Sequence, residues 1–422
     1  MHSVTNAIPT GTIASIPAKA HAHRALICAA LANSPSTILL SRTSKDIDAT
    51  MDSLRGLGAH VVYENKIVTV TPGPAPAKGN VVPHESGTTL RLLLPVAASI
   101  CNDVDVDAKG RLPDRPLEPM LGEMKAHGVT FSQDKPPFTM TGRLQGGNFS
   151  MVGDVSSQFF SGLLLAAPQI GLSTITSTTP LQSSDYVTLT TETMRDFGVE
   201  VEHTLPDTNI NEAFTVPFGA SFIGRDNYQI EGDWSNAAIW MVAAGMTGKP
   251  VTITGMNKNS VQADRRIMQV MIDAGCDVVW DGMNVTVTGR ASKPIHADLE
   301  QMPDMLPVMA ALACSISGES SFVKGARLRL KESDRLVAVA NLVRDLGGTV
   351  REEGDDLYII GSGILKGGHG DCVNDHRLVM AGTLMALISE NPVTLQDSEA
   401  ITKSYPHFFE DWNLLGGNAQ PV

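Results

Sequence analysis

Residues 51–72 read MDSLRGLGAHVVYENKIVTVTP, and their pattern indicates the fold class of the chain. It opens with the spacing of an amphipathic helix, reaches Gly58, and continues with alternating apolar and polar residues. Glycine suits the left-handed backbone conformation that commonly ends a helix, and alternation with a period of two is typical of β-strands. The stretch therefore predicts a helix followed by a β-hairpin.

The same pattern recurs along the chain. Its helices end at Gly58, Gly128, Gly198, Gly275 and Gly347. The gaps between these positions are 70, 70, 77 and 72 residues, and such a period indicates a repeat architecture. A sixth helix, FFEDWNLLGG (408–417), has almost no chain after it. We expect its hairpin to come from the N-terminal stretch TGTIASIP (10–17).

A second series of helices runs in phase with the first. Each helix opens with a polar cluster and continues as an Ala/Leu-rich run, with starts at Lys19, Ser86, Val155, Asp233, Pro303 and Asn374. A helix that is apolar nearly all round must be buried, so six of them require cores enclosed by other layers. We expect two lobes of three repeats. Residues 1–17 and 230–422 would form lobe I, closed by both termini, and residues 18–229 would form lobe II.

Length and charge narrow the function classes. A chain of 422 residues exceeds one ordinary core. It carries 32 Lys and Arg against 45 Asp and Glu, a formal charge of -13. This charge repels nucleic acid and anionic membrane, so we expect neither as a partner. An anionic ligand needs a local concentration of positive charge.

Cysteine usage and the N-terminus favour a cytoplasmic protein. The five cysteines are scattered, without the paired spacing of a zinc or redox motif, and are expected to be reduced thiols. The first residues lack the charged start and apolar core of a secretory signal. Charged or polar residues interrupt every apolar run before the roughly 18 residues that a membrane span requires.

Cations stand where a helix start disfavours them. A helix N-terminus carries partial positive charge and attracts anions, yet Lys19, Arg24, Arg91 and Arg377 lie in predicted first turns. The alternative is that buried helices simply need polar caps, but a cap does not require cations. We infer anion sites at the helix starts, which would form one cleft if they converge between the lobes.

Two further segments add cations. GRLPDRPLEP (110–119) contains Arg111 and Arg115. RLRLKESDRL (327–336) contains Lys331 and Arg335, which we expect on one helical face at spacing i, i+4. The alternative for this second segment is a solvated helix start in which Glu332 and Arg335 form a surface pair.

His21 and His23 in IPAKAHAHRAL (16–26) raise the question of a metal site. Two histidines spaced i, i+2 at a helix start point their rings to different faces. No further His or carboxylate lies nearby in sequence to complete a ligand set. We therefore expect no metal here.

Ten short motifs occur in order along the whole chain: KAHAHR, SGTTLR, PDRPLEP, SSQF, SSDY, GDWSNA, PDMLP, KESDRL, NDHR and TKSYPHFFE. Together they resemble the 5-enolpyruvylshikimate-3-phosphate (EPSP) synthases, or 3-phosphoshikimate 1-carboxyvinyltransferases. The resemblance implies an α/β (α+β) fold, a two-lobed inside-out α/β barrel of six βαβαββ-type repeats. It also implies a cytoplasmic enzyme of the shikimate pathway without metal or cofactor, and we expect a monomer.

The implied reaction transfers the enolpyruvyl group of phosphoenolpyruvate to the 5-hydroxyl of shikimate 3-phosphate and releases phosphate. Its substrates carry two phosphates and two carboxylates, so it requires cations and an acid/base pair. By resemblance, phosphoenolpyruvate is bound by Lys19, Gly87, Arg115, Gln158, Arg335, His376, Arg377 and Lys403. By the same resemblance, shikimate 3-phosphate is bound by Lys19, Ala20, Arg24, Ser156, Ser157, Gln158, Ser183, Tyr186, Asp304, Arg327 and Lys331.

The implied catalytic residues are Asp304, Glu332 and Lys19. Asp304 matches the carboxylate beside the attacking hydroxyl, and Glu332 the carboxylate near the methylene carbon. Asp304 could instead be only a helix cap, and Lys19 could move the proton because like charges lower the pKa of a lysine. Gly87 matches the glycine that leaves room for the herbicide glyphosate, which predicts sensitivity.

The first motif departs from the family pattern Pro-Gly-Ser-Lys-Ser-x-Ser-x-Arg. Ala20 and Ala22 replace serines, Pro17 stands where glycine is usual, and His21 has no assigned role. Weaker shikimate binding, an altered glyphosate response and a modified substrate stay open.

Two other functions stay open. One is enolpyruvyl transfer to UDP-N-acetylglucosamine, although enzymes of that kind carry Lys-Asn in the first motif and usually a Cys in the Arg-Pro loop. This chain has Ala20 after Lys19 and no Cys in that loop. The other is a catalytically silent anion-binding relative, against which the retention of Asp304 and Glu332 argues.

Overall fold

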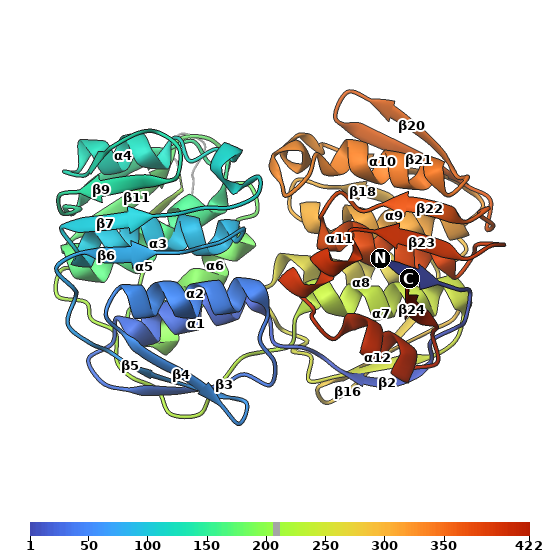
Figure 1. The fold of residues 1–422 in the computed structure, drawn as a ribbon, viewed down its shortest axis with the longest axis horizontal. Coiled ribbons are helices and arrows are strands. Elements are labelled where there is room, and N and C mark those ends of the chain that lie inside the picture. Colours follow the sequence, from blue (N-terminus) through green and yellow to red (C-terminus); the bar gives the residue numbers. More distant parts are fainter. Residues whose placement is uncertain (206–211) are drawn as a thin grey trace. The chain divides into compact units, whose positions relative to one another are not determined.

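The chain forms one part of a first unit, builds a second unit, and returns to complete the first. The computed structural model describes residues 1–205 and 212–422. Unit 1 consists of Met1–Ile16 and Glu231–Val422, and unit 2 consists of Pro17–Ile230 (Figure 1). Each unit has its own hydrophobic core.

Within residues 1–205 and 212–422, each unit contains three helices that are buried almost all round. In unit 2 these are α1 (Lys19–Ala30), α3 (Gly87–Ile100) and α5 (Ser157–Ile170). In unit 1 they are α7 (Trp234–Thr247), α9 (Leu306–Ser315) and α11 (His376–Ala386). These six helices are the Ala/Leu-rich series that the sequence predicts to be buried.

Three further helices in each unit bury one side. In unit 2 these are α2 (Lys45–Gly56), α4 (Met120–Ala126) and α6 (Asp185–Asp196). In unit 1 they are α8 (Ile267–Asp273), α10 (Arg335–Asp345) and α12 (Phe408–Leu414). All six glycines that follow them have φ between +86° and +105°, as predicted. At Gly58 a Cβ would also lie 2.3 Å from the carbonyl oxygen of Pro74, so no other residue fits without movement.

The described part of unit 2 has three four-stranded sheets. Their orders are β14-β3-β5-β4, β6-β7-β9-β8 and β10-β11-β13-β12. The first contains β14 (Tyr228–Gln229), β3 (Ser36–Leu39), β5 (Ile67–Thr71) and β4 (His60–Glu64). The second contains β6 (Gly79–Val81), β7 (Asp103–Val106), β9 (Phe138–Thr141) and β8 (Thr130–Phe131). The third contains β10 (Gly147–Met151), β11 (Ser173–Ser177), β13 (Ala213–Val216) and β12 (Glu202–Thr204).

Unit 1 also has three four-stranded sheets. Their orders are β16-β17-β15-β2, β18-β19-β21-β20 and β22-β23-β1-β24. The first contains β16 (Asp277–Asp281), β17 (Asn284–Thr288), β15 (Val251–Thr254) and β2 (Gly11–Ala14). The second contains β18 (His296–Asp298), β19 (Gly318–Val323), β21 (Asp356–Gly361) and β20 (Thr349–Glu353). The third contains β22 (Gly368–Asp371), β23 (Val393–Gln396), β1 (His2–Val4) and β24 (Ala419–Pro421).

The expected donor of the sixth hairpin was wrong. The stretch TGTIASIP supplies β2, which pairs in parallel with β15 in the fourth repeat. The sixth sheet is instead completed by β1 and β24, which are antiparallel neighbours. No turn joins these two strands, because one comes from each end of the chain. The N–H of Val422 donates to the carbonyl of Met1 at 3.2 Å. Figure 1 shows the two termini beside each other in unit 1.

The reason for this difference is the strand pattern that the six described sheets share: one edge strand pairs in parallel with its neighbour, and the other two pairings are antiparallel. In the first repeat the parallel partner of β3 is β14, the last strand of unit 2. The corresponding partner of β15 must then come from the N-terminal segment, which β2 provides.

Within residues 1–205 and 212–422, none of the helices combines the length and apolar character that a membrane span requires.

Replacement of Ser3 by proline tests the central place of β1. β1 is flanked by β23 and β24, so the lost N–H breaks a ladder hydrogen bond. We expect Ser3→Pro to lower the free energy of unfolding of unit 1 by about 2 kcal/mol. Urea unfolding followed by tryptophan fluorescence measures this, because all four tryptophans belong to unit 1.

Thr12→Pro is the matched control. β2 is an edge strand, and the N–H groups of Gly11 and Ser15 donate on the side of β15. Because the direction of the N–H groups alternates along a strand, the Thr12 N–H points away from the sheet. We expect a smaller effect there. Equal destabilisation by both substitutions would contradict the central position of β1.

Candidate functional site

The predicted cations and carboxylates of unit 1 meet around Arg335. This residue begins α10, because the side chain of Asp334 caps the helix by accepting from the N–H of Val337. The Arg335 side chain is only 2% exposed. Its guanidinium donates to Asp304 at 2.6 Å, to Glu332 at 2.6 Å and to Asp375 at 2.8 Å. One buried arginine thus holds three carboxylates.

The expectation that Lys331 and Arg335 share a helical face was wrong. Because Asp334 starts the helix, Lys331 lies before it in extended backbone. Lys331 still reaches the site, with Nζ 3.1 Å from Oδ1 of Asp304. Glu332 does pair with Arg335, but the buried guanidinium excludes a merely solvated surface pair.

Asp304 binds cations and does not cap a helix. It lies in the 3-10 turn Pro303–Met305 before α9, and no side chain caps either element. Burial alone would raise the pKa of its carboxyl, but Lys331, Arg335 and Arg377 outweigh this effect and hold it well below its usual range. Asp304 is therefore an ionised carboxylate.

The cations around Asp304 respond to the same surroundings. Burial lowers the pKa of Lys331, an effect that Asp304 opposes and that the positive charges of Arg335 and Arg327 reinforce. Arg327 lies in the 3-10 segment Ala326–Leu330 that leads to Lys331. Burial would lower the pKa of Arg335, but its three carboxylate partners raise it and keep the side chain cationic.

The start of α11 collects the remaining predicted residues of unit 1. Asp375 caps this helix by accepting from the N–H of Arg377 at 2.9 Å. The guanidinium of Arg377 donates to the carbonyl of Ser235 at 3.2 Å, and His376 beside it is buried. Lys403 donates from Nζ to the carbonyl of Asn374 at 2.7 Å. These side chains thus gather at one helix N-terminus.

In unit 2 the start of α3 brings together three predicted residues. Ser86 caps the helix by accepting from the N–H of Thr89. The guanidinium of Arg115 lies so close to Gly87 that a Cβ there would be 2.5 Å from Nη1. Gln158 donates to the Thr88 hydroxyl at 2.9 Å. Gly87 therefore makes room for a cation at this helix start.

The predicted serines lie at the starts of two helices. Ser156 caps α5 by accepting from the N–H of Gln158 at 3.3 Å. Ser157 is the first residue of α5 and is buried. Ser183 is also buried and has a φ of +54° just before α6. Capping accounts for Ser156 without any ligand.

The start of α1 carries Lys19, Ala20 and Arg24. Lys19 pairs with Asp46 at 2.7 Å. Arg24 is fully buried and donates to the carbonyls of Ala20 at 2.6 Å and Tyr186 at 2.9 Å. Arg24 and Tyr186 are thus brought together, and the Arg24 guanidinium is already held by protein acceptors.

Three carboxylates near the predicted residues, Asp46, Asp264 and Asp375, were not predicted from the sequence. Asp46 and Asp375 read in the sequence as helix-start residues, and nothing there reveals their partners Lys19 and Arg335. Asp264 is buried and hydrogen-bonded to the hydroxyl of Ser235. Burial and, next, the charge of Asp304 raise the pKa of Asp264 to about 6. Only proximity in the folded chain distinguishes these carboxylates from ordinary surface aspartates.

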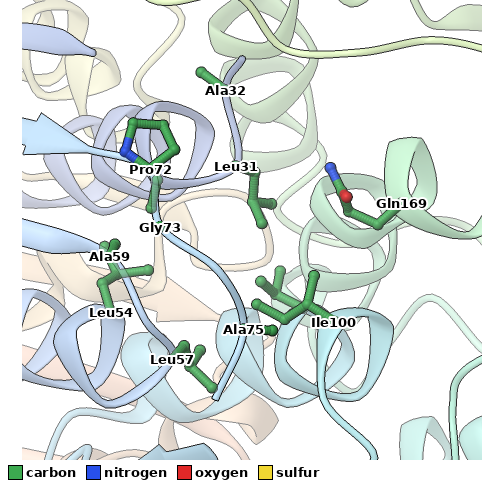
Figure 2. A pocket seen from close by; sticks show the side chains of 12 residues that line it. Leu31, Ala32, Leu54, Leu57, Ala59, Pro72, Gly73, Ala75, Ile100 and Gln169 are labelled. Atoms are coloured by element: carbon green, nitrogen blue, oxygen red, sulfur yellow. The ribbon is translucent and has the colours of Figure 1, made fainter. Parts of the chain in front are cut away.

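An apolar cavity in unit 2 is separate from these groups. Its volume is about 160 Å³, and it lies at the C-terminal ends of α1, α3 and α5, whose N-termini carry the predicted residues. Figure 2 shows that Gln169 is the polar side chain among aliphatic neighbours such as Leu31 and Leu57. Such a lining offers no charge for a phosphate.

Among the described residues, no three His, Cys, Asp or Glu side chains converge as metal ligands would.

Comparison with known proteins identifies the family. The family model described as EPSP synthase (3-phosphoshikimate 1-carboxyvinyltransferase) matches residues 7–412. A 3-phosphoshikimate 1-carboxyvinyltransferase of Clostridium kluyveri is 35% identical over 412 residues, which cover 96% of this chain and 95% of the relative. The enzyme of that name from Methanocorpusculum labreanum is 34% identical, and the match covers 97% of both chains.

A solved structure of the EPSP synthase from Acinetobacter baumannii matches the fold. The TM-score is 0.80, with coverage of 100% of this chain and 99% of the other at 23% identity. The expected α/β fold of six repeats is thereby confirmed. The chain belongs to the EPSP synthase (3-phosphoshikimate 1-carboxyvinyltransferase) family.

Proposed function

We propose that this chain transfers the enolpyruvyl group of phosphoenolpyruvate to the 5-hydroxyl of shikimate 3-phosphate and releases phosphate, as a step of the shikimate pathway. The observation that carries the proposal is the environment of Asp304. Three cations, Lys331, Arg335 and Arg377, surround one ionised carboxylate. This arrangement suits a reaction in which anionic substrates and a proton acceptor must share one site. Family membership supports the same activity.

The substrates account for the number of cations. Together they bring two phosphates and two carboxylates to a chain whose formal charge is -13. Arginine can bind carboxylate and phosphate oxygens with two parallel hydrogen bonds. The proposed phosphoenolpyruvate contacts are Lys19, Gly87, Arg115, Gln158, Arg335, His376, Arg377 and Lys403. The proposed shikimate 3-phosphate contacts are Lys19, Ala20, Arg24, Ser156, Ser157, Gln158, Ser183, Tyr186, Asp304, Arg327 and Lys331.

Substrate binding would change the basicity of Asp304. Its cations hold the pKa low in the unliganded chain, which makes the carboxylate a weak base. Substrate anions that bind Lys331, Arg335 and Arg377 would compensate part of their charge, and the pKa of Asp304 would rise toward the range of an effective base.

The proposed steps conserve atoms and charge. Asp304 accepts the proton of the 5-hydroxyl as its oxygen bonds to C2 of phosphoenolpyruvate, and Glu332 delivers a proton to the methylene carbon. The methyl group of the adduct then returns a proton to Glu332 as the C2–O bond to phosphate breaks, and Asp304 passes the proton of the former hydroxyl to the departing phosphate. Lys19 is the alternative proton carrier at the methylene carbon.

We propose that the chain acts in the cytoplasm as a monomer. All five cysteines are buried and none forms a disulfide, which fits a reducing compartment. The proposed partners are the two small-molecule substrates.

Phosphate release tests the activity directly. We expect release when shikimate 3-phosphate and phosphoenolpyruvate are supplied together, and none when either is omitted. Release with UDP-N-acetylglucosamine in place of shikimate 3-phosphate would move the assignment to that transfer. Binding of phosphoenolpyruvate without release from any acceptor would identify a silent relative.

Neutral variants of the two carboxylates test the proton transfers. We expect Asp304→Asn and Glu332→Gln each to lower kcat by about 100-fold or more, because each removes an acid/base group. Steady-state rates at saturating substrate measure this. Asp298→Asn is the control, since Asp298 pairs with Lys324 at the surface of the same unit. Unchanged kcat in both site variants would contradict the assigned roles.

Gly87→Ala tests the role of the glycine beside Arg115. The added Cβ meets the end of a flexible side chain, so the guanidinium has to shift while the fold persists. We expect a several-fold higher KM for phosphoenolpyruvate and weaker inhibition by glyphosate. Gly122→Ala in α4, where a Cβ would meet only Glu118 at 3.1 Å, is the control. Unchanged glyphosate inhibition in Gly87→Ala would refute the assignment of Gly87.

A further inference from the structure

α1, like α9, begins without the side-chain cap that the other four buried helices have. The side chains of Ser86, Ser156, Asp233 and Asp375 cap α3, α5, α7 and α11. The residue before α1 is Ala18, which has no side-chain acceptor. A helix start without such a cap is less stable than a capped one. This first turn carries Lys19, a proposed substrate contact, and other interactions of its side chains hold the turn in place.

The side chain of His21 supplies that support. Its Nε2 lies 2.8 Å from the hydroxyl of Tyr228, and that hydroxyl donates to Oδ2 of Asp196 at 2.8 Å. A phenol has one proton, and Tyr228 gives it to the carboxylate. Nε2 of His21 must therefore carry a proton and donate to Tyr228. The three residues form a hydrogen-bonded chain with a defined direction.

Ring packing holds this chain in place. The rings of His21 and Tyr228 meet edge to face at 5.5 Å, and Tyr228 meets Phe197 in the same manner at 5.0 Å. Burial lowers the pKa of His21 to about 4, against the opposing charge of Asp196. His21 is therefore neutral at pH 7 and does not add a third positive charge beside Lys19 and Arg24.

The first two turns of α1 are thus attached to their neighbours through three side chains. Lys19 pairs with Asp46 in α2. His21 is hydrogen-bonded to Tyr228 in β14, and Tyr228 in turn donates to Asp196 at the end of α6. Arg24, one turn further, donates to the hydroxyl of Thr190 in α6 at 2.7 Å. These attachments fix both the rotation of α1 and the direction in which its first turn projects side chains.

We propose that His21 is a positioning residue of the reaction, which acts with Tyr228 and Asp196 to fix the first turn of α1 and so to direct the amine of Lys19. The inference rests on the proposed function, in which Lys19 contacts both substrates. It gives a role to the position that the sequence motif leaves unexplained.

Tyr228→Phe tests the inference most cleanly, because it removes the hydroxyl and keeps the ring contacts. We expect kcat/KM for phosphoenolpyruvate to fall about tenfold, as a small misplacement of a substrate contact does. Tyr63→Phe, on β4 of the same unit, is the control and should leave kcat/KM unchanged. His21→Leu should reproduce the loss. His21→Gln should largely retain the wild-type kcat/KM, because the glutamine amide can donate to the Tyr228 hydroxyl from nearly the position of Nε2.

A double-mutant cycle with Lys19→Ala separates positioning from general destabilisation. If His21, Tyr228 and Asp196 act through Lys19, Tyr228→Phe causes no further loss of kcat/KM in the Lys19→Ala background. An undiminished tenfold loss there, or wild-type kinetics in Tyr228→Phe, would overturn the inference. Lack of phosphate release by the wild-type chain would instead refute the proposed function, so the two failures are distinguishable.

Discussion

The burial of six nearly apolar helices is the constraint on which the rest of the structure depends. A buried helix has no water to satisfy the N–H groups of its first turn, so polar side chains must gather there. Ser86, Ser156, Asp233 and Asp375 do this for four helices. The packing of the core and the placement of the polar groups therefore have one cause. The positive ends of the helices add to the attraction for anions.

Charge compensation is the second constraint, and it is strictest around Arg335. A buried guanidinium among Asp304, Glu332 and Asp375 is stable because each partner is hydrogen-bonded to it. Removal of one member of a buried ion pair typically destabilises a protein by about 3 to 5 kcal/mol. The same network keeps Asp304 ionised and leaves it responsive to any anion that binds its cations.

The repeat made much of this predictable. The glycine period of about 70 residues indicated the number of repeats, and the polar starts of the Ala/Leu-rich runs indicated where side chains would gather. Local rules were less reliable at the chain ends and at helix starts. The sixth sheet uses His2–Val4 and not residues 10–17, and Asp334 starts α10 after Lys331. Strand partners and exact helix starts depend on which neighbours are available.

The periodic units, the buried helices and the residue types at their starts could be predicted from the sequence, because they depend on spacing along the chain. Which charges meet could be seen only in the folded chain. Asp375 and Arg335 lie 40 residues apart, and His21 and Tyr228 lie 207 apart. The pKa of a buried group depends on distance and solvent access, which the order of residues does not contain. For that reason His21 had no role in the sequence and has partners in the fold.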